Sequence, residues 1–193
     1  MEDLLKQIRS CTVCQQHLPN TPNPIVQLNE YSKIIIIGQA PSRRVHETRI
    51  PWNDASGRKL REWLAVDESD FYNPNLFSIL PMGFCYPGKG KSGDLPPRPE
   101  CAKLWHSQLS EAFHSDPLLI LIGQYAQRYY LKSTFKGNLT DTVKNYSSYL
   151  PKYFPLPHPS PRNQNWVKTN PWFSNEVLPD LKEIVNNLLQ KNS

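Results

Sequence analysis

Short, uninterrupted apolar runs alternate with amphipathic stretches along this chain. Four isoleucines stand at 34–37 and the run LLILI stands at 118–122, and a glycine closes each run. Such runs are typical of strands that are buried on both faces of a parallel sheet. We predict two further strands, over 76–80 and 154–156. Because the predicted strands alternate with helical stretches, the pattern indicates an α/β fold with a mainly parallel sheet.

The stretches between these runs repeat apolar residues at helical spacing. The expected helices cover residues 3–10, 54 or 56 to 64, 99–113, 126–131, and 170 to the C-terminus. Asp54 or Ser56 can cap the second helix, and Pro179 predicts a kink in the last. Residues 132–152 show no usable periodicity, and 81–99 are rich in Gly, Pro and Lys. We expect the latter segment to be a functional loop.

Three segments with polar or conformationally special residues leave predicted strand ends. They begin at Gly38, Pro81 and Pro157. In open parallel sheets, ligands bind outside the carboxyl ends of the strands. We therefore expect these segments to converge on one cleft.

The composition suits one folded domain, which we take to span 1–193. Of the 193 residues, 38% are hydrophobic and 20% are charged, which excludes disorder throughout. No apolar run approaches the ~20 residues of a membrane span, and the N-terminus lacks the apolar stretch of a signal peptide. We therefore expect a soluble, cytoplasmic monomer with no membrane partner. The net charge of +5 permits a polyanionic partner such as nucleic acid.

All four cysteines fit one metal-binding pattern. Cys11 and Cys14 form a CxxC pair; Cys85 follows after 70 intervening residues, and Cys101 after a further 15. Four thiolates suit either zinc or an iron-sulfur cluster, and the spacing alone does not separate the two. Disulfides are the weaker interpretation for a cytoplasmic chain, and unrelated thiols are the remaining alternative.

Three local motifs at the strand ends carry chemistry. The turn 38–42, GQAPS, can hold an anionic oxygen on its backbone N–H groups, although a purely structural turn has the same pattern. Trp52, after Pro51, offers a flat face to a base, or is simply part of the core. The third motif, HPSPRN at 158–163, is rigid, basic and polar, and it places His158 just beyond a strand end. It is the most specific of the three.

At these residues the sequence resembles the uracil-DNA glycosylase superfamily, over most of the chain from Cys11 to Trp172. The cysteine spacing, the buried strand that runs into GQAP, and the Pro-Trp pair before a glycine resemble the iron-sulfur uracil-DNA glycosylases called family four. The motif HPSPRN is similar to the second motif of the single-strand-selective monofunctional branch. The resemblance implies a three-layer sandwich with a central four-stranded parallel sheet. It also implies a [4Fe-4S] cluster on Cys11, Cys14, Cys85 and Cys101, with zinc as the alternative.

The sequence departs from the family pattern at several motif positions. Gln39 and Ser42 replace the Glu and the second Gly of the family-four motif GEAPG. Ala40 stands where other branches place the Asp or Asn that orients the attacking water. Pro81 occupies the position of an Asn that reads the base edge in the iron-sulfur enzymes. The specificity for uracil is therefore open.

The resemblance assigns roles to residues of this chain. The catalytic candidates are His158, Gln39 and Asp54. His158 would donate a hydrogen bond to the base oxygen where negative charge accumulates. Asp54 could instead serve only as a helix cap. Glu47 is the other carboxylate near enough to orient a water. The expected base-binding residues are Gly38, Ala40, Pro41, Trp52 and Met82, and the expected DNA-binding residues are Ser42, Ser160, Arg162, Asn163, Lys89 and Lys91.

The leading hypothesis is a monofunctional DNA glycosylase that removes uracil or a related deaminated base from single- or double-stranded DNA. No lysine stands in these motifs as a Schiff-base nucleophile, so lyase activity is not expected. The alternative is a glycosylase-like protein that binds DNA or abasic sites without catalysis, as Gln39, Ala40 and Pro81 suggest. A small metal-thiolate redox protein is the third hypothesis.

Overall fold

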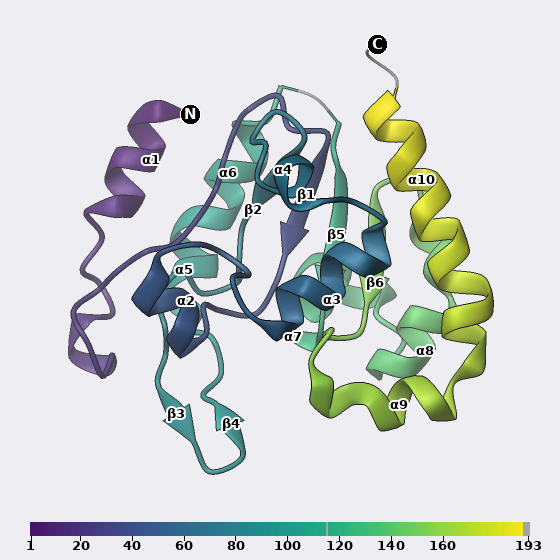
Figure 1. The fold of residues 1–193 in the computed structure, drawn as a ribbon. Coiled ribbons are helices and arrows are strands. Elements are labelled where there is room, and N and C mark those ends of the chain that lie inside the picture. Colours follow the sequence, from purple (N-terminus) through teal and green to yellow (C-terminus); the bar gives the residue numbers. More distant parts are fainter. Residues whose placement is uncertain (115, 191–193) are drawn as a thin grey trace.

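A four-stranded parallel sheet forms the centre of the molecule (Figure 1), which is a computed structural model that describes residues 1–114 and 116–190. Its strands are β1 Ile34–Ile37, β2 Phe77–Ile79, β5 Leu118–Ile122 and β6 Tyr153–Leu156. They lie in the order β2-β1-β5-β6, and all three strand pairs are parallel. The predicted α/β fold is confirmed, with all four strands close to their expected positions.

The alternating side chains of the central strand enter two separate cores. Ile34 and Ile36 belong to one buried cluster, and Ile35 and Ile37 belong to another. All four residues are at most 2% exposed. Because successive side chains of a strand point to opposite faces, a strand covered by helices on both faces must be apolar throughout, as β1 is.

Helices cover both faces of the sheet and complete three layers (Figure 1). The helices are α1 Glu2–Arg9, α2 Arg43–Thr48, α3 Ala55–Leu64, α4 Glu68–Phe71, α5 Pro99–Cys101, α6 Ser107–Glu111, α7 Gln124–Leu131, α8 Leu139–Lys144, α9 Gln164–Thr169 and α10 Leu178–Gln190. Helices α3 and α10 pack on the face with Ile34 and Ile36. Helices α1, α6 and α7 pack on the opposite face.

Two expected helices contain wider turns than an α-helix. The stretch predicted over 99–113 consists of α5, a π-helical turn at Ala102–His106 and α6. The C-terminal helix contains a second π-helical turn, Phe173–Val177, which ends two residues before Pro179. Proline has no N–H to donate and its ring crowds the preceding turn, so the regular hydrogen-bond ladder cannot pass through this point.

Several short elements lie in segments that the sequence pattern left without structure. A hairpin of β3, Lys89–Gly90, and β4, Gly93–Asp94, stands in the loop 81–99 and projects from the body of the protein (Figure 1). Helix α8 lies within 132–152, where Asn138 caps it by accepting a hydrogen bond from the Asp141 N–H at 2.8 Å. Within the described part of the chain, no helix combines the length and the apolarity that crossing a bilayer requires.

Candidate functional site

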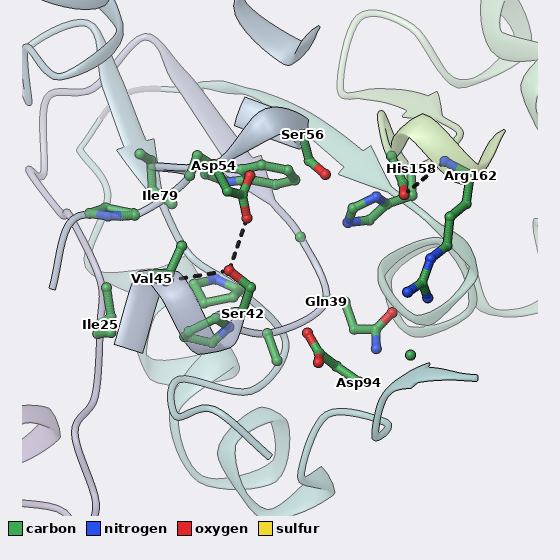
Figure 2. Close-up of a pocket in the computed structure, with 18 of the residues that line it drawn as sticks. Ile25, Gln39, Ser42, Val45, Asp54, Ser56, Ile79, Asp94, His158 and Arg162 are labelled. Carbon is green, nitrogen blue, oxygen red and sulfur yellow. Dashed lines mark hydrogen bonds between the residues drawn. The ribbon is translucent and has the colours of Figure 1, made fainter. Parts of the chain in front are cut away.

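A cavity of about 460 Å³ opens at the carboxyl end of the parallel sheet (Figure 2). Its walls come from the segments that follow β1, β2 and β6, from the loop between α2 and α3, and from the β3–β4 hairpin. The predicted convergence of the segments after Gly38, Pro81 and Pro157 is therefore confirmed. Its volume lies within the range of about 300–1,000 Å³ that is common for small-molecule sites.

Most of the predicted site residues line this cavity. Those that do are Gly38, Gln39, Ala40, Pro41, Ser42, Trp52, Asp54, His158, Ser160, Arg162 and Asn163. Met82 does not line the cavity; it is 5% exposed and lies in the core cluster on the α1, α6 and α7 side of the sheet. Lys89 and Lys91 are exposed on the hairpin rather than in the cavity wall.

The turn after β1 is joined to the start of α2 and α3. Ser42 caps α2 by accepting from the Val45 N–H at 3.3 Å, and its hydroxyl donates to Asp54 Oδ2 at 2.9 Å. Asp54 Oδ1 accepts from the Gly57 N–H at 3.0 Å, which caps α3. Both carboxylate oxygens of Asp54 therefore have a hydrogen-bond donor (Figure 2 shows the bond from Ser42), and the capping interpretation of this residue is correct.

Trp52 has an unusual backbone conformation, and two glycines pack closely against it. Its φ is +57°, in the left-handed region, where a bulky side chain is rarely found. A Cβ on Gly57 would lie 1.7 Å from the Trp52 carbonyl oxygen, and a Cβ on Gly38 would lie 2.8 Å from the indole Cζ2. The hydroxyl of Tyr72 also donates to the Pro51 carbonyl at 2.8 Å. These contacts fix the indole over the turn that follows β1.

His158 lies beside this indole, with the two ring centroids 5.7 Å apart. Its carbonyl accepts from Asn163 Nδ2 at 2.8 Å, which holds the loop 158–163 in a compact turn. Neither imidazole nitrogen has a hydrogen-bond partner among the described residues. Burial lowers the pKa of His158, and the nearby carboxylate of Asp54 opposes that shift. The imidazole is therefore neutral at neutral pH, and its ring nitrogens are available to a ligand in the cavity.

The hairpin forms the remaining wall, and side chains from the segments 38–42 and 158–163 bond to it. Arg162 Nη1 donates to the Ser92 carbonyl at 2.9 Å, and Gln39 Nε2 donates to the Leu95 carbonyl at 3.3 Å. At Gly93, φ is +143° and a Cβ would lie 2.8 Å from Arg162 Nη1. The positive φ favours a glycine at this position, and the end of the Arg162 side chain lies against it.

Asp94, on β4, is a cavity residue that sequence reasoning missed. It is the single acidic residue in the loop 81–99, and an isolated acid in a basic, glycine-rich loop was the signal that could have identified it. Figure 2 shows its carboxyl near the Gln39 side chain, on the cavity side of the hairpin. Burial raises the pKa of Asp94, while the charge of Arg162 opposes the shift.

The four cysteines gather around a second, smaller cavity. Cys11, Cys14, Cys85 and Cys101 line it together with Leu18, Pro22, Pro24, Phe84 and Arg98. The Phe84 N–H donates to Cys101 Sγ at 3.5 Å. Burial raises the pKa of Cys85 to about 11 and that of Cys101 to about 12. Over residues 1–114 and 116–190, no group of three or more His, Cys, Asp or Glu side chains is arranged to hold a metal ion.

Comparison with known proteins identifies the family. A model of the uracil-DNA glycosylase superfamily matches residues 25–182. The chain belongs to the uracil-DNA glycosylase superfamily. It is also similar to a type-4 uracil-DNA glycosylase of Archaeoglobus fulgidus, with 30% identity over 84 residues. The aligned segment covers 42% of this chain and 42% of that relative. In this superfamily member, the cavity at the strand ends and the cysteine cavity are separate sites, because none of the residues that the structure describes lines both.

Proposed function

We propose that this superfamily member is a monofunctional glycosylase that hydrolyses the N-glycosidic bond of uracil or a related deaminated base in DNA. The observation that carries the proposal is the unpartnered imidazole of His158, beside the Trp52 indole in a base-sized cavity. The similarity to a type-4 uracil-DNA glycosylase supports it independently.

The target nucleotide must leave the base stack before the reaction, at a cost of a few kcal/mol. In the proposed complex its base enters the cavity and lies against the Trp52 indole, which is fixed by Gly38 and Gly57. A rigid aromatic face recovers part of that cost, since base stacking on an aromatic side chain contributes about 1–3 kcal/mol.

Bond cleavage places positive charge on the sugar and negative charge on the departing base. The C1′–N bond breaks with its electron pair leaving on the base, a water adds its oxygen to C1′, and the proton that this water loses ends on the departed base by way of the solvent. His158 donates an N–H to the base oxygen that gains charge. Because its pKa is lowered, His158 does this as a neutral imidazole, which stays a donor without a change of charge.

Two further residues act on the sugar side in this proposal. The Gln39 amide nitrogen is engaged with the Leu95 carbonyl, so its oxygen is free to orient the attacking water. Asp54 contributes its negative charge near the developing sugar cation while it caps α3. Glu47 is the weaker candidate, because Arg43 Nε donates to it at 2.9 Å on the exposed face of α2 and it does not line the cavity.

The absence of a lysine among the described cavity-lining residues supports hydrolysis without strand cleavage. Lys89 and Lys91, on the projecting hairpin, are proposed to contact DNA phosphates, as are the polar groups of Ser42, Ser160 and Asn163. Arg162 is proposed to bind phosphate or to fill the space left by the extruded base, once its bond to Ser92 opens.

The cysteine cavity is proposed to hold a [4Fe-4S] cluster that ties α1 and its following loop to the domain. The four cysteines line one cavity, as a four-thiolate centre requires, and such a set suits zinc as well as iron. The preference for the cluster rests on the resemblance to the iron-sulfur family-four enzymes. Arg98 in the cavity wall and the Phe84 N–H offset the negative charge of bound thiolates.

A binding protein without catalysis is the second candidate, and one observation favours it. Ala40 supplies no carboxylate to the cavity, and both oxygens of Asp54 already accept hydrogen bonds.

One experiment distinguishes the two candidates. The protein is incubated with single- and double-stranded oligonucleotides that carry one uracil, hypoxanthine or xanthine, and alkali then cleaves the strand at any abasic site. We expect strand cleavage at uracil after alkali and none before it. Salt-dependent binding with intact strands for every deaminated base would support the second candidate instead.

A further inference from the structure

The Asp94 carboxylate is a cavity group to which the proposed function gives no role. It lines the cavity, yet no hydrogen bond or ion pair engages it among the described residues. Its neighbours by charge are Arg162, Asp54 and Lys89. Burial and the charge of Asp54 raise the pKa of Asp94, and the charges of Arg162 and Lys89 oppose that shift by favouring the ionised carboxylate.

The hairpin fixes the backbone position of Asp94. Asp94 pairs with Lys89 across the hairpin, two residues after Ser92, whose carbonyl accepts from Arg162 Nη1. The Leu95 N–H donates to the Gly88 carbonyl at 2.8 Å, and the Leu95 carbonyl accepts from Gln39. The pairing with Lys89 and the two bonds at Leu95 therefore hold the backbone of Asp94 at the cavity wall, where the residue stays exposed to an incoming ligand.

An ionised carboxylate only accepts hydrogen bonds, so it distinguishes ring nitrogens that carry a proton from those that carry a lone pair. Deamination makes this change: cytosine N3 and adenine N1 are acceptors, whereas uracil N3 and hypoxanthine N1 carry a hydrogen. We propose that Asp94 accepts the ring N–H created by deamination and so makes the cavity select deaminated bases over their parents. This inference rests on the proposed function. It identifies the ring N–H as the feature of the substrate base that the cavity recognises.

The selection works in both directions. A deaminated base donates its N–H to a charged acceptor, and its cytosine or adenine parent would place a lone pair against a negative charge. Thymine keeps its N3–H, so Asp94 does not reject it. Pro81 lines the same cavity and, as a proline, has no side-chain group that can read a base edge, which leaves Asp94 as the charged acceptor of the hairpin wall.

The test measures binding without requiring cleavage. Single-stranded oligonucleotides carry 2′-fluoro-uridine, 2′-fluoro-cytidine or 2′-fluoro-N3-methyluridine at one position, because the fluorine suppresses glycosidic cleavage. Fluorescence anisotropy gives the affinity for each. The intact protein should bind the uracil oligonucleotide about 10- to 100-fold more tightly than the other two, as expected for loss of one hydrogen bond to a charged group.

Two variants separate the role of Asp94 from steric exclusion and from folding. Asp94→Ala should bind the uracil and N3-methyluracil oligonucleotides within about threefold of each other. Asp94→Asn can donate as well as accept, so it should bind the cytosine oligonucleotide more tightly than the wild type does. Asp3→Asn, an exposed change on α1, is the matched control and should preserve the discrimination.

The outcomes separate the inference from the proposed function. Equal affinities of the wild type for all three oligonucleotides, or discrimination that persists in Asp94→Ala, would overturn the inference even if uracil is released from unmodified DNA. Selective binding that disappears in Asp94→Ala, in a protein that releases no base, would support the inference and reject the glycosylase activity.

Discussion

The Trp52 indole lies directly over Gly38, at a distance that leaves no room for a side chain on the glycine. A Cβ at position 38 would come 2.8 Å from Cζ2 and 3.6 Å from Cε2 of the indole. The backbone of Gly38 does not have a positive φ, so its small size, rather than its conformational freedom, is what the site uses.

Gly38→Ala should therefore move the indole without unfolding the protein. Displacement of an active-site group by about 1 Å can cost about 100-fold in rate, so we expect at least a tenfold loss of base release in single-turnover assays. Thermal unfolding provides the control and should change by only a few degrees. A variant with unchanged base release would show that the position of Trp52 does not matter to the reaction.

Asp54 should prove as important to stability as to the reaction. Replacement by Ala removes the cap of α3 and the acceptor of the Ser42 hydroxyl, and we expect the free energy of unfolding to fall by about 1–2 kcal/mol. Asp54→Asn keeps a capping oxygen and should stay within about 0.5 kcal/mol of the wild type. Urea denaturation measures both changes.

Asp67→Ala is the matched control, because Asp67 caps α4 through the Asp70 N–H at 2.8 Å and does not line the cavity. It should lower stability by a similar amount and leave base release unaltered. If Asp54→Ala is as stable as the wild type, the structural role assigned to Asp54 is wrong.

The sequence predicted the buried sheet well because its strands carry an unambiguous signal. Four consecutive isoleucines and LLILI can be satisfied only between two covered faces, and the strand ends then determine where the cavity must lie. The role of Asp54 as a cap was also readable, since an Asp directly before an amphipathic stretch is a common helix start.

The hairpin and the short polar helices were not predictable in the same way. The strands at Lys89 and Gly93 are two residues long, too short to show alternation, and they depend on tertiary bonds from Arg162 and Gln39. Asp94 was missed for that reason. Met82 was expected among the base-binding residues, but its side chain lies in the core cluster that contains Ile35 and Ile37 and does not line the cavity.

The cysteine cavity gives a prediction about metal content. Protein purified without oxygen should contain about four iron and four sulfide ions per chain if the proposed cluster is present, and it should absorb broadly in the visible blue. Cys101→Ser should lower the iron content and the melting temperature together, because Cys101 is buried beside Phe84. Zinc found in place of iron and sulfide would support the alternative metal.

His106 should make stability depend on pH. It is 1% exposed, its Nε2–H donates to the Pro81 carbonyl at 3.1 Å, and its Nδ1 accepts from the Tyr130 hydroxyl at 2.8 Å. Burial lowers the pKa of His106 to about 4. The unfolded chain therefore takes up this proton more readily than the folded protein, and stability should fall as the pH falls from about 6.5 to about 4.

The expected loss through His106 is about 3 kcal/mol over that pH window. Urea denaturation at pH 7 and pH 4.5 measures it, and His106→Gln should remove most of this dependence. His17→Gln, an exposed histidine, is the control and should leave the dependence in place. An identical pH dependence in wild type and His106→Gln would contradict the assignment.

The central claim is that the neutral imidazole of His158 assists departure of a base bound against Trp52. Single-turnover base release from a uracil-containing single strand, with wild type and His158→Ala compared at pH 7.5, tests it most directly. We predict base release by the wild type and a rate about 100- to 1,000-fold lower for the variant, with oligonucleotide affinity nearly unchanged. Equal rates for the two proteins would contradict the account.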